Sequence, residues 1–411
     1  MKGIFLLPGK AAARMGPAAL IGLIIGGLLC FCIALCFAEV GSRVKGTGGA
    51  YLYARKAFGE FVGFEVGWMT CCVAVIAWAT LSNGFTEVFA EFVPAVGEGV
   101  TQKCVAVGIV TLLTLVNLMG ADMGARVVKF FTIAKLVPIV AFIVVGLFYI
   151  EPSNFTPFAP KGYEPLAQTT MILLYAFVGF ETMVVPAGEM ENPQRAVPLS
   201  LFVVLAVSAA VYVLLYVVAT GTYAGLAGTK NPVALAAGEF MGRFGGTMIL
   251  VGIALSVFGT NAGAALVSPR RFFALAERGD LPAVIARVSP KSGAPVPAII
   301  LTWFLAVSLT VSGSFEQLLV LGVVARFAQY IPTTLAVLVL RRRAGYDPTA
   351  GYTIPGGPIV PLITLSLCGW LLFHTDPIKL KMGAQALAVG AILYAFKSIR
   401  ARRAQSASQN D

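Results

Sequence analysis

Residues 175–198 read YAFVGFETMVVPAGEMENPQRAVP and continue an apolar run that begins near Leu166. The run is long enough to cross a bilayer, since a helix needs roughly 20 residues to span the hydrocarbon. Gly179 nevertheless lies two residues before the carboxylate Glu181, and Pro186 follows closely. A membrane helix interrupted in this way must satisfy its freed backbone groups through protein neighbours, water or a ligand. The stretch therefore predicts a membrane helix that is broken for a functional purpose.

The composition predicts an all-α polytopic membrane protein in a lipid bilayer. Hydrophobic residues make up 58% of the 411 and charged residues only 12%, and the apolar stretches repeatedly reach spanning length. The net charge of +11 does not indicate a nucleic-acid partner, because the Lys and Arg residues lie between apolar spans and form no aromatic-interleaved basic surface. We interpret this charge as a determinant of membrane topology.

Cysteine and histidine usage argues against enzyme chemistry. The seven cysteines fall almost entirely inside apolar spans and form no spaced Cys/His ligand set, so neither disulfides nor a metal site is indicated. The single histidine, His374, stands at the end of a span, which removes histidine-based triads. The sequence predicts a protein that is not an enzyme and that needs no cofactor or metal.

The apolar segments predict twelve spans, of which the first is a half-span near the start. The others are residues 17–40, 61–93, 105–120, 127–150, 166–189, 199–223, 245–276, 297–311, 315–340, 359–373 and 383–396. The connections between spans alternate between the two sides of the membrane. The set that includes Arg271, taken together with the tail, carries more than twice as many Lys and Arg residues as the other set. Short cytoplasmic loops are rich in these residues. We therefore expect a protein of the cytoplasmic (plasma) membrane with both termini in the cytoplasm, and a disordered tail from Lys397.

The chain enters an apolar segment at once, with GIFLLPG at residues 3–9. A signal peptide is the less favoured interpretation, because Pro8 and Lys10 interrupt its core. The alternative is the second half of a broken helix. In that case we expect the genomic sequence upstream of Met1 to encode roughly 20 to 40 further residues, enough for a tail and a half-span.

A weak internal repeat divides the chain. Residues 1–150 hold five spans and residues 166–340 hold five more, and because five is odd the second set runs in the opposite sense. Each set opens with a segment interrupted by glycine and proline, which is the best sequence pointer to the midplane binding site of a transporter. Glycine and proline are, however, common in membrane helices in general. Residues 359–396 add two helices, and residues 397–411 a cytoplasmic tail.

Four motifs follow one another along the chain. They are GIFLLPG at 3–9, TGGAYLYA at 47–54, FVGFE at 177–181 with NPQR at 192–195, and PR at 269–270 with AERGDLP at 276–282. With these motifs the chain resembles, over essentially its whole length, the amino acid permeases of the amino acid, polyamine and organocation superfamily. The resemblance implies the five-plus-five inverted repeat of the leucine transporter fold. It also implies a half-helix and a Gly-Ser-Gly step at the first break, where this sequence has only Met1 and Lys2.

Two helix breaks are expected to form the substrate site. A helix that restarts near Gly3 presents unpaired N–H groups and a positive dipole end to a substrate carboxylate. A half-helix that ends near Tyr175 leaves unpaired carbonyls for a substrate ammonium. By resemblance, the substrate-binding residues are Gly3, Ile4, Phe5, Tyr175, Ala176, Phe177, Val178 and Gly179.

Ionisable residues inside spans are candidates for proton coupling. Lys135 is the most isolated of them, and an ammonium in hydrocarbon is by default a functional hypothesis, with a structural ion pair or a snorkelling side chain as the alternative. By resemblance, Lys135 occupies the place that a sodium ion takes in sodium-coupled relatives. Glu181 either braces the broken segment or relays protons. Arg326 is expected to pair with an acid or to face water, and Glu39 and Glu65 to form interfacial ion pairs.

The leading expectation is a proton-coupled secondary active importer of amino acids. Residues 176–179 carry no charge and Ala264 is small, so a cationic substrate side chain would be buried without a partner, and neutral amino acids are favoured. An amino acid/amine or polyamine exchanger is the alternative within transport. A non-transporting membrane subunit or amino acid sensor is the alternative of another class. The expected partners are an amino acid, protons and lipid, and homo-oligomers are left open.

Overall fold

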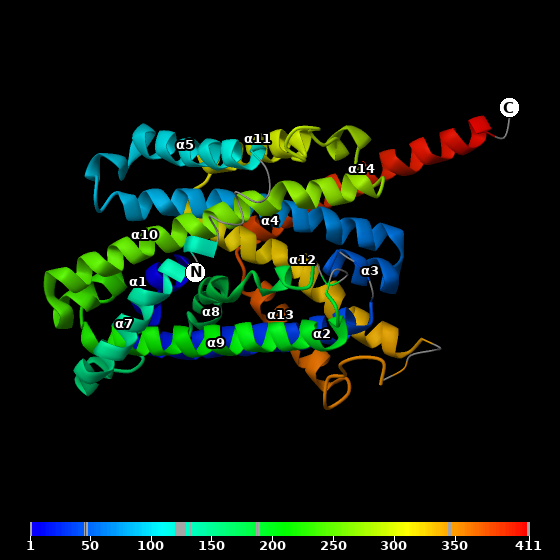
Figure 1. Cartoon of the computed structure of the whole chain (residues 1–411). Coiled ribbons are helices and arrows are strands. Elements are labelled where there is room, and N and C mark those ends of the chain that lie inside the picture. Colours follow the sequence, from blue (N-terminus) through cyan, green and yellow to red (C-terminus); the bar gives the residue numbers. More distant parts are fainter. Residues whose placement is uncertain are drawn as a thin grey trace.

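The computed structural model describes residues 2–44, 46, 48–119, 129–131, 133–185, 187, 190–229, 231–343, 347 and 349–408. Within these residues every regular element is a helix (Figure 1). Eight segments are long and apolar enough to cross a membrane, and three shorter apolar helices accompany them. The all-α polytopic class expected from the composition is confirmed. Pro186 lies outside the described residues.

Apart from the short helix Ala50–Phe58, which lies between two expected spans, the longer helices follow one another in the order of those spans. They are α1 (Lys2–Met15), α2 (Ala19–Arg43), α3 (Ala50–Phe58), α4 (Glu60–Phe89), α5 (Gly99–Leu118), α7 (Leu136–Gly146), α8 (Leu166–Phe177), α9 (Pro193–Thr222), α10 (Pro232–Glu277), α11 (Val296–Ser312), α12 (Phe315–Arg341), α13 (Ile359–Phe373) and α14 (Pro377–Ser408).

Two of these helices differ from the sequence expectation in their length. α10 contains a kink at Gly242, whose φ of 63° breaks the helix, so its long spanning part begins close to the expected residue 245. α14 continues to Ser408, and the prediction of a disordered tail from Lys397 is wrong. The tail carries Ala, Arg and Gln, which are good helix formers and let the preceding span continue without a break.

The helices pack in two groups with the broken helix between them (Figure 1). α4 packs against α10 and α5, and α5 packs against α11, while α2 packs against α9 and α8. α12 contacts both groups through α4 and α2. The ring of Phe37 on α2 meets Tyr330 of α12 and Phe180 edge-on, each at about 6 Å between centroids. This aromatic cluster fixes the position of the segment that follows α8.

Candidate functional site

The predicted break in the helix near residue 179 is present. α8 ends at Phe177, and Val178 is extended with ψ of 150°. Gly179 has a φ of +113°, a conformation that a side chain with a Cβ rarely adopts, and a short 3-10 turn, Phe180–Thr182, follows. Because the helix stops here, the carbonyls of its last turn have no helical N–H partner four residues on.

A cavity of about 430 Å³ lies beside this break. Its volume is in the range of small-molecule sites, about 300 to 1,000 Å³. α10 contributes a strip of small and polar side chains to the wall, and α4 and α9 contribute mostly apolar ones. From α10 the cavity receives Ser256, Gly259, Thr260, Gly263, Ala264, Val267, Ser268 and Arg271.

Most of the residues singled out in the sequence meet at this cavity. Five consecutive ones, from Tyr175 to Gly179, line it, and Lys135 and Glu181 line it too. Phe5 does not: it is 0% exposed and packs in the main apolar core. Gly3 and Ile4 belong to α1, which packs against α8 and α10, but their surroundings lie outside the described part of the structure.

Glu181 is held by three donors. Arg326 Nε donates to Glu181 Oε1 over 3.0 Å, Gly179 N–H donates to Oε2 over 2.8 Å, and Tyr330 Oη–H donates to Oε2 over 3.3 Å. Both members of the ion pair are buried, with side chains 3% and 6% exposed. The sequence expected Arg326 to pair with an acid or face water, and Glu181 is that acid. The carboxylate thus connects the broken segment to α12. This arrangement agrees with the structural role that was one of the two alternatives for Glu181.

Lys135 faces the cavity from the residue before α7. Its side chain belongs to a residue only 8% exposed, so it does not reach a lipid-facing surface. None of the ion pairs formed within the described residues involves it. Of the two structural alternatives for this lysine, neither the snorkelling side chain nor the structural ion pair is seen in the described part of the chain.

Arg271 is a cavity residue that the sequence reading missed. Arg271 falls inside the predicted span 245–276, but its charge was assigned to a connection. That assignment is wrong, because Arg271 belongs to α10 and lines the cavity. A signal was available: the cavity residues of α10 recur every three or four positions from Ser256 to Arg271, which is the period of one helix face.

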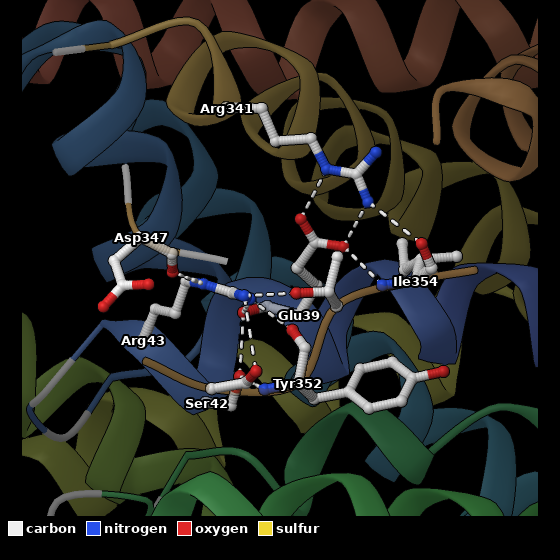
Figure 2. A network of polar contacts seen from close by, with 9 residues as sticks. Glu39, Ser42, Arg43, Arg341, Asp347, Tyr352 and Ile354 are labelled. Carbon is white, nitrogen blue, oxygen red and sulfur yellow. Dashed lines mark hydrogen bonds and ion pairs between the residues drawn. The ribbon is translucent and has the colours of Figure 1, made fainter. Parts of the chain in front are cut away.

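A second ion pair lies away from the cavity, at the end of α2. Arg341 Nε donates to Glu39 Oε1 over 2.6 Å, and Ile354 N–H donates to Oε2 over 2.8 Å. The neighbouring Arg43 donates to the carbonyls of Asp347 and Tyr352. Figure 2 shows how these contacts clamp the connection between α12 and α13 onto α2. The ion pair expected for Glu39 is therefore present.

Glu65 forms no ion pair with any residue that the structure describes, in contrast to the expectation. Both carboxylate oxygens are buried without a hydrogen-bond partner among the described residues. The reason is the neighbour on the opposite helix: Glu65 packs against Gly390 of α14, where a Cβ atom would come within 2.6 Å of its Oε2. Nearby Trp68 bonds instead to the backbone, through the carbonyl of Ala386.

Comparison with known proteins gives a consistent result. The model of the amino acid permease family matches residues 1–394. The chain is 28% identical to the methylthioribose transporter of Bacillus subtilis and 26% identical to its branched-chain amino acid permease BcaP, in both cases over 95% of this chain and 88% of the relative. It is 30% identical to the serine/threonine exchanger SteT of Bacillus subtilis, over 89% of this chain and 84% of that protein.

The family model spans both groups of helices and the broken helix with its cavity. The relatives are named as transporters or exchangers of small molecules, and none of these names describes an enzyme. The protein is thus an integral membrane transporter and not an enzyme. The chain belongs to the amino acid permease family.

Proposed function

We propose that this protein is a proton-coupled secondary active transporter that imports neutral amino acids across the cytoplasmic membrane. The observation that carries the proposal is the cavity at the α8 break, which brings the C-terminal end of a helix together with mostly apolar walls. The two five-helix repeats, residues 1–150 and 166–340, would each supply one broken helix to this site. Both termini are proposed to lie in the cytoplasm, on the basis of the Lys and Arg distribution.

The two ends of an amino acid match the two helix ends. In the proposal, the substrate ammonium bonds to the carbonyls of Tyr175, Ala176 and Phe177 at the end of α8. The substrate carboxylate bonds to N–H groups at the start of α1, at Gly3 and Ile4, where the helix dipole is positive. The packing of α1 against α8 supports this arrangement. Phe5, which is buried in the core, would hold α1 in place and not touch the substrate.

Charge balance in the cavity favours neutral substrates. The charged residues among the described lining are Lys135, Glu181, Arg271 and Arg326. Glu181 is already paired with Arg326, so no carboxylate is available to a cationic side chain, and burying that side chain unpaired is costly. Ala264 leaves space for an apolar side chain. Two of the relatives are named for branched-chain amino acids and for serine and threonine, which are neutral.

Proton coupling is assigned to Lys135. Its ammonium faces the cavity with no ion pair among the described residues to hold its charge. A change in its charge would alter the electrostatics of the substrate site directly. Coupling requires that the two conformations of the transporter bind the proton with different affinity. Glu181, fixed by its three donors, is the second candidate.

The test is uptake into proteoliposomes. A symporter concentrates labelled leucine or alanine when only a pH gradient is imposed. An exchanger, which the similarity to SteT keeps as the second candidate, takes up label only against a preloaded amino acid. A sensor or non-transporting subunit takes up none in either experiment. Competition in which arginine displaces the label better than leucine or alanine would overturn the neutral preference.

A further inference from the structure

The cavity face of α10 ends in an arginine. Small residues such as Gly259, Gly263 and Ala264 form this face, and Arg271 stands two turns beyond Ala264. At 1.5 Å per residue this places its Cα about 10 Å farther along the helix. Every other cavity residue of α10 is uncharged. The guanidinium is therefore the one charge that α10 presents to the cavity.

Among the described residues, no carboxylate forms an ion pair with Arg271. Nη1 donates to the carbonyl oxygen of Thr70 on α4 over 2.9 Å, which fixes the side chain across the wall. Nε is buried with no hydrogen-bond partner in the described part of the chain. The ion pairs of the described residues do not include Arg271, and the cavity carboxylate Glu181 is taken by Arg326. A buried cation that lacks a counter-ion is costly to keep, which points to a use.

We propose that Arg271 excludes cationic substrates from the cavity, acting as a charge filter that admits amino acids without net charge. This inference rests on the proposed function. A substrate with a cationic side chain enters the cavity that the guanidinium lines, and like charges repel more strongly inside a protein than in bulk water. A neutral side chain meets no such repulsion. The substrate class of the site is accordingly set by one residue of α10 in addition to the shape of the break.

Arg271 suits this task better than Lys135, the other cavity cation that forms no ion pair among the described residues. A guanidinium stays protonated at every physiological pH, so a filter made from arginine is permanent. Lys135 is the proposed coupling residue, and its charge has to change during transport. A filter made from that lysine would open each time it lost its proton. In this proposal Arg271 therefore selects the substrate, and Lys135 couples transport to protons.

The experiment compares competition ratios in proteoliposomes. Inhibition of labelled leucine uptake by ornithine is measured relative to inhibition by unlabelled leucine, for the wild type, Arg271→Gln and Arg271→Lys. Arg271→Gln should raise the relative affinity for ornithine about tenfold or more, equivalent to about 1.4 kcal/mol, and Arg271→Lys should keep the wild-type ratio. A ratio in Arg271→Gln within about twofold of wild type, which is about 0.4 kcal/mol, would overturn the proposal.

A matched control is available on the same helix. Arg270 is the neighbouring residue, does not line the cavity, and donates to the carbonyl of Leu266 on its own helix. Arg270→Gln should leave the ratio at its wild-type value. An equal rise in Arg270→Gln would show that general loss of positive charge is responsible, and the proposal would fail.

The pH dependence of ornithine exclusion in the wild type is a second measurement. It tests the proposal even if Arg271→Gln does not fold. Exclusion of ornithine should be constant between about pH 6 and about pH 8, because arginine keeps its charge there. Exclusion that weakens about tenfold across this range would assign the filter to a titrating group and overturn the proposal. If the wild type transports no neutral amino acid, the proposed function fails. If it transports leucine and only the ratios disagree, this inference alone fails.

Discussion

Glu181 and Glu39 are two buried carboxylates that pair with arginines of the same helix, α12. Glu181 is 4% exposed and bonds to Arg326 over 3.0 Å, and Glu39 is 2% exposed and bonds to Arg341 over 2.6 Å. Glu181 lies in the irregular segment after α8 and lines the cavity, whereas Glu39 lies in the regular helix α2 and clamps a connecting loop.

The comparison teaches that position, and not the chemistry of the pair, decides which ion pair lies at the candidate substrate cavity. The Glu39 carboxylate accepts bonds from Arg341 at the end of α12 and from the N–H of Ile354, so its energy depends on the loop after α12. Glu181 also accepts the N–H of Gly179 in the break itself. Any change in the break on substrate binding must therefore change the Glu181 pair. The following predictions are ordered by the expected loss of unfolding free energy.

Replacing Glu181 should have the largest effect. Glu181→Ala leaves the guanidinium of Arg326 buried without a partner, and breaking a buried ion pair in this way costs about 3 to 5 kcal/mol. It also removes the acceptor of the Gly179 N–H. We expect both lower thermal stability in detergent and loss of leucine uptake. Wild-type uptake in Glu181→Ala at unchanged stability would contradict the role of the pair as a brace.

Replacing Glu39 should have a smaller effect on stability and little on substrate binding. The side chain of Arg341 is 16% exposed, against 6% for Arg326, so water can partly replace its lost partner. For Glu39→Gln we expect a loss of about 1.5 to 3 kcal/mol, the value of hydrogen bonds to a charged group. Binding of leucine to the folded fraction, measured by calorimetry, should stay near the wild-type affinity. A loss of binding as large as that of Glu181→Ala would break the comparison.

A change in the loop should weaken the same clamp without touching a charge. A Cβ on Gly351 would lie 2.7 Å from Ser42 Oγ and 3.1 Å from Arg43 Cγ, so these side chains would have to shift. Gly351→Ala is expected to cost about 1 kcal/mol, at the low end for overpacking. Its melting temperature should fall less than that of Glu39→Gln. As a control, Gly369→Ala on α13 adds a Cβ into open space and should leave stability unchanged.

Removing the unpaired lysine should have the smallest effect on stability and the largest on coupling. Lys135→Ala leaves no described partner charge behind, so no ion pair is known to be broken, and we expect a loss below about 1 kcal/mol, the centre of the usual range for point mutants. The variant should fold and bind leucine, but it should lose concentrative uptake and the dependence of binding on pH. If the pH dependence of leucine affinity coincides in wild type and variant, Glu181 becomes the coupling candidate.

The sequence determined the features that depend on short stretches of chain. Apolar runs of spanning length predicted the helices from α2 to α14 except α3, which lies between two expected spans. Gly179 predicted the break in α8, because a span length and a positive φ are properties of neighbouring residues. Lys135 and Glu181 could be identified from the sequence because an ionisable group within an apolar run is rare and is a functional hypothesis by default. Their shared cavity could not be read in this way.

Only the tertiary structure decided which distant side chains meet. Glu181 and Arg326 are 145 positions apart, and the sequence recorded both charges without indicating that they pair. Glu65 was expected to pair like Glu39, but packing against Gly390 leaves it without a described partner. Arg271 fell inside a predicted span but was assigned to a connection, and only the packing of α10 shows that it lines the cavity. The physical reason is common to all these cases: partners in a helical bundle are set by how helix faces pack, and packing joins residues that are remote along the chain.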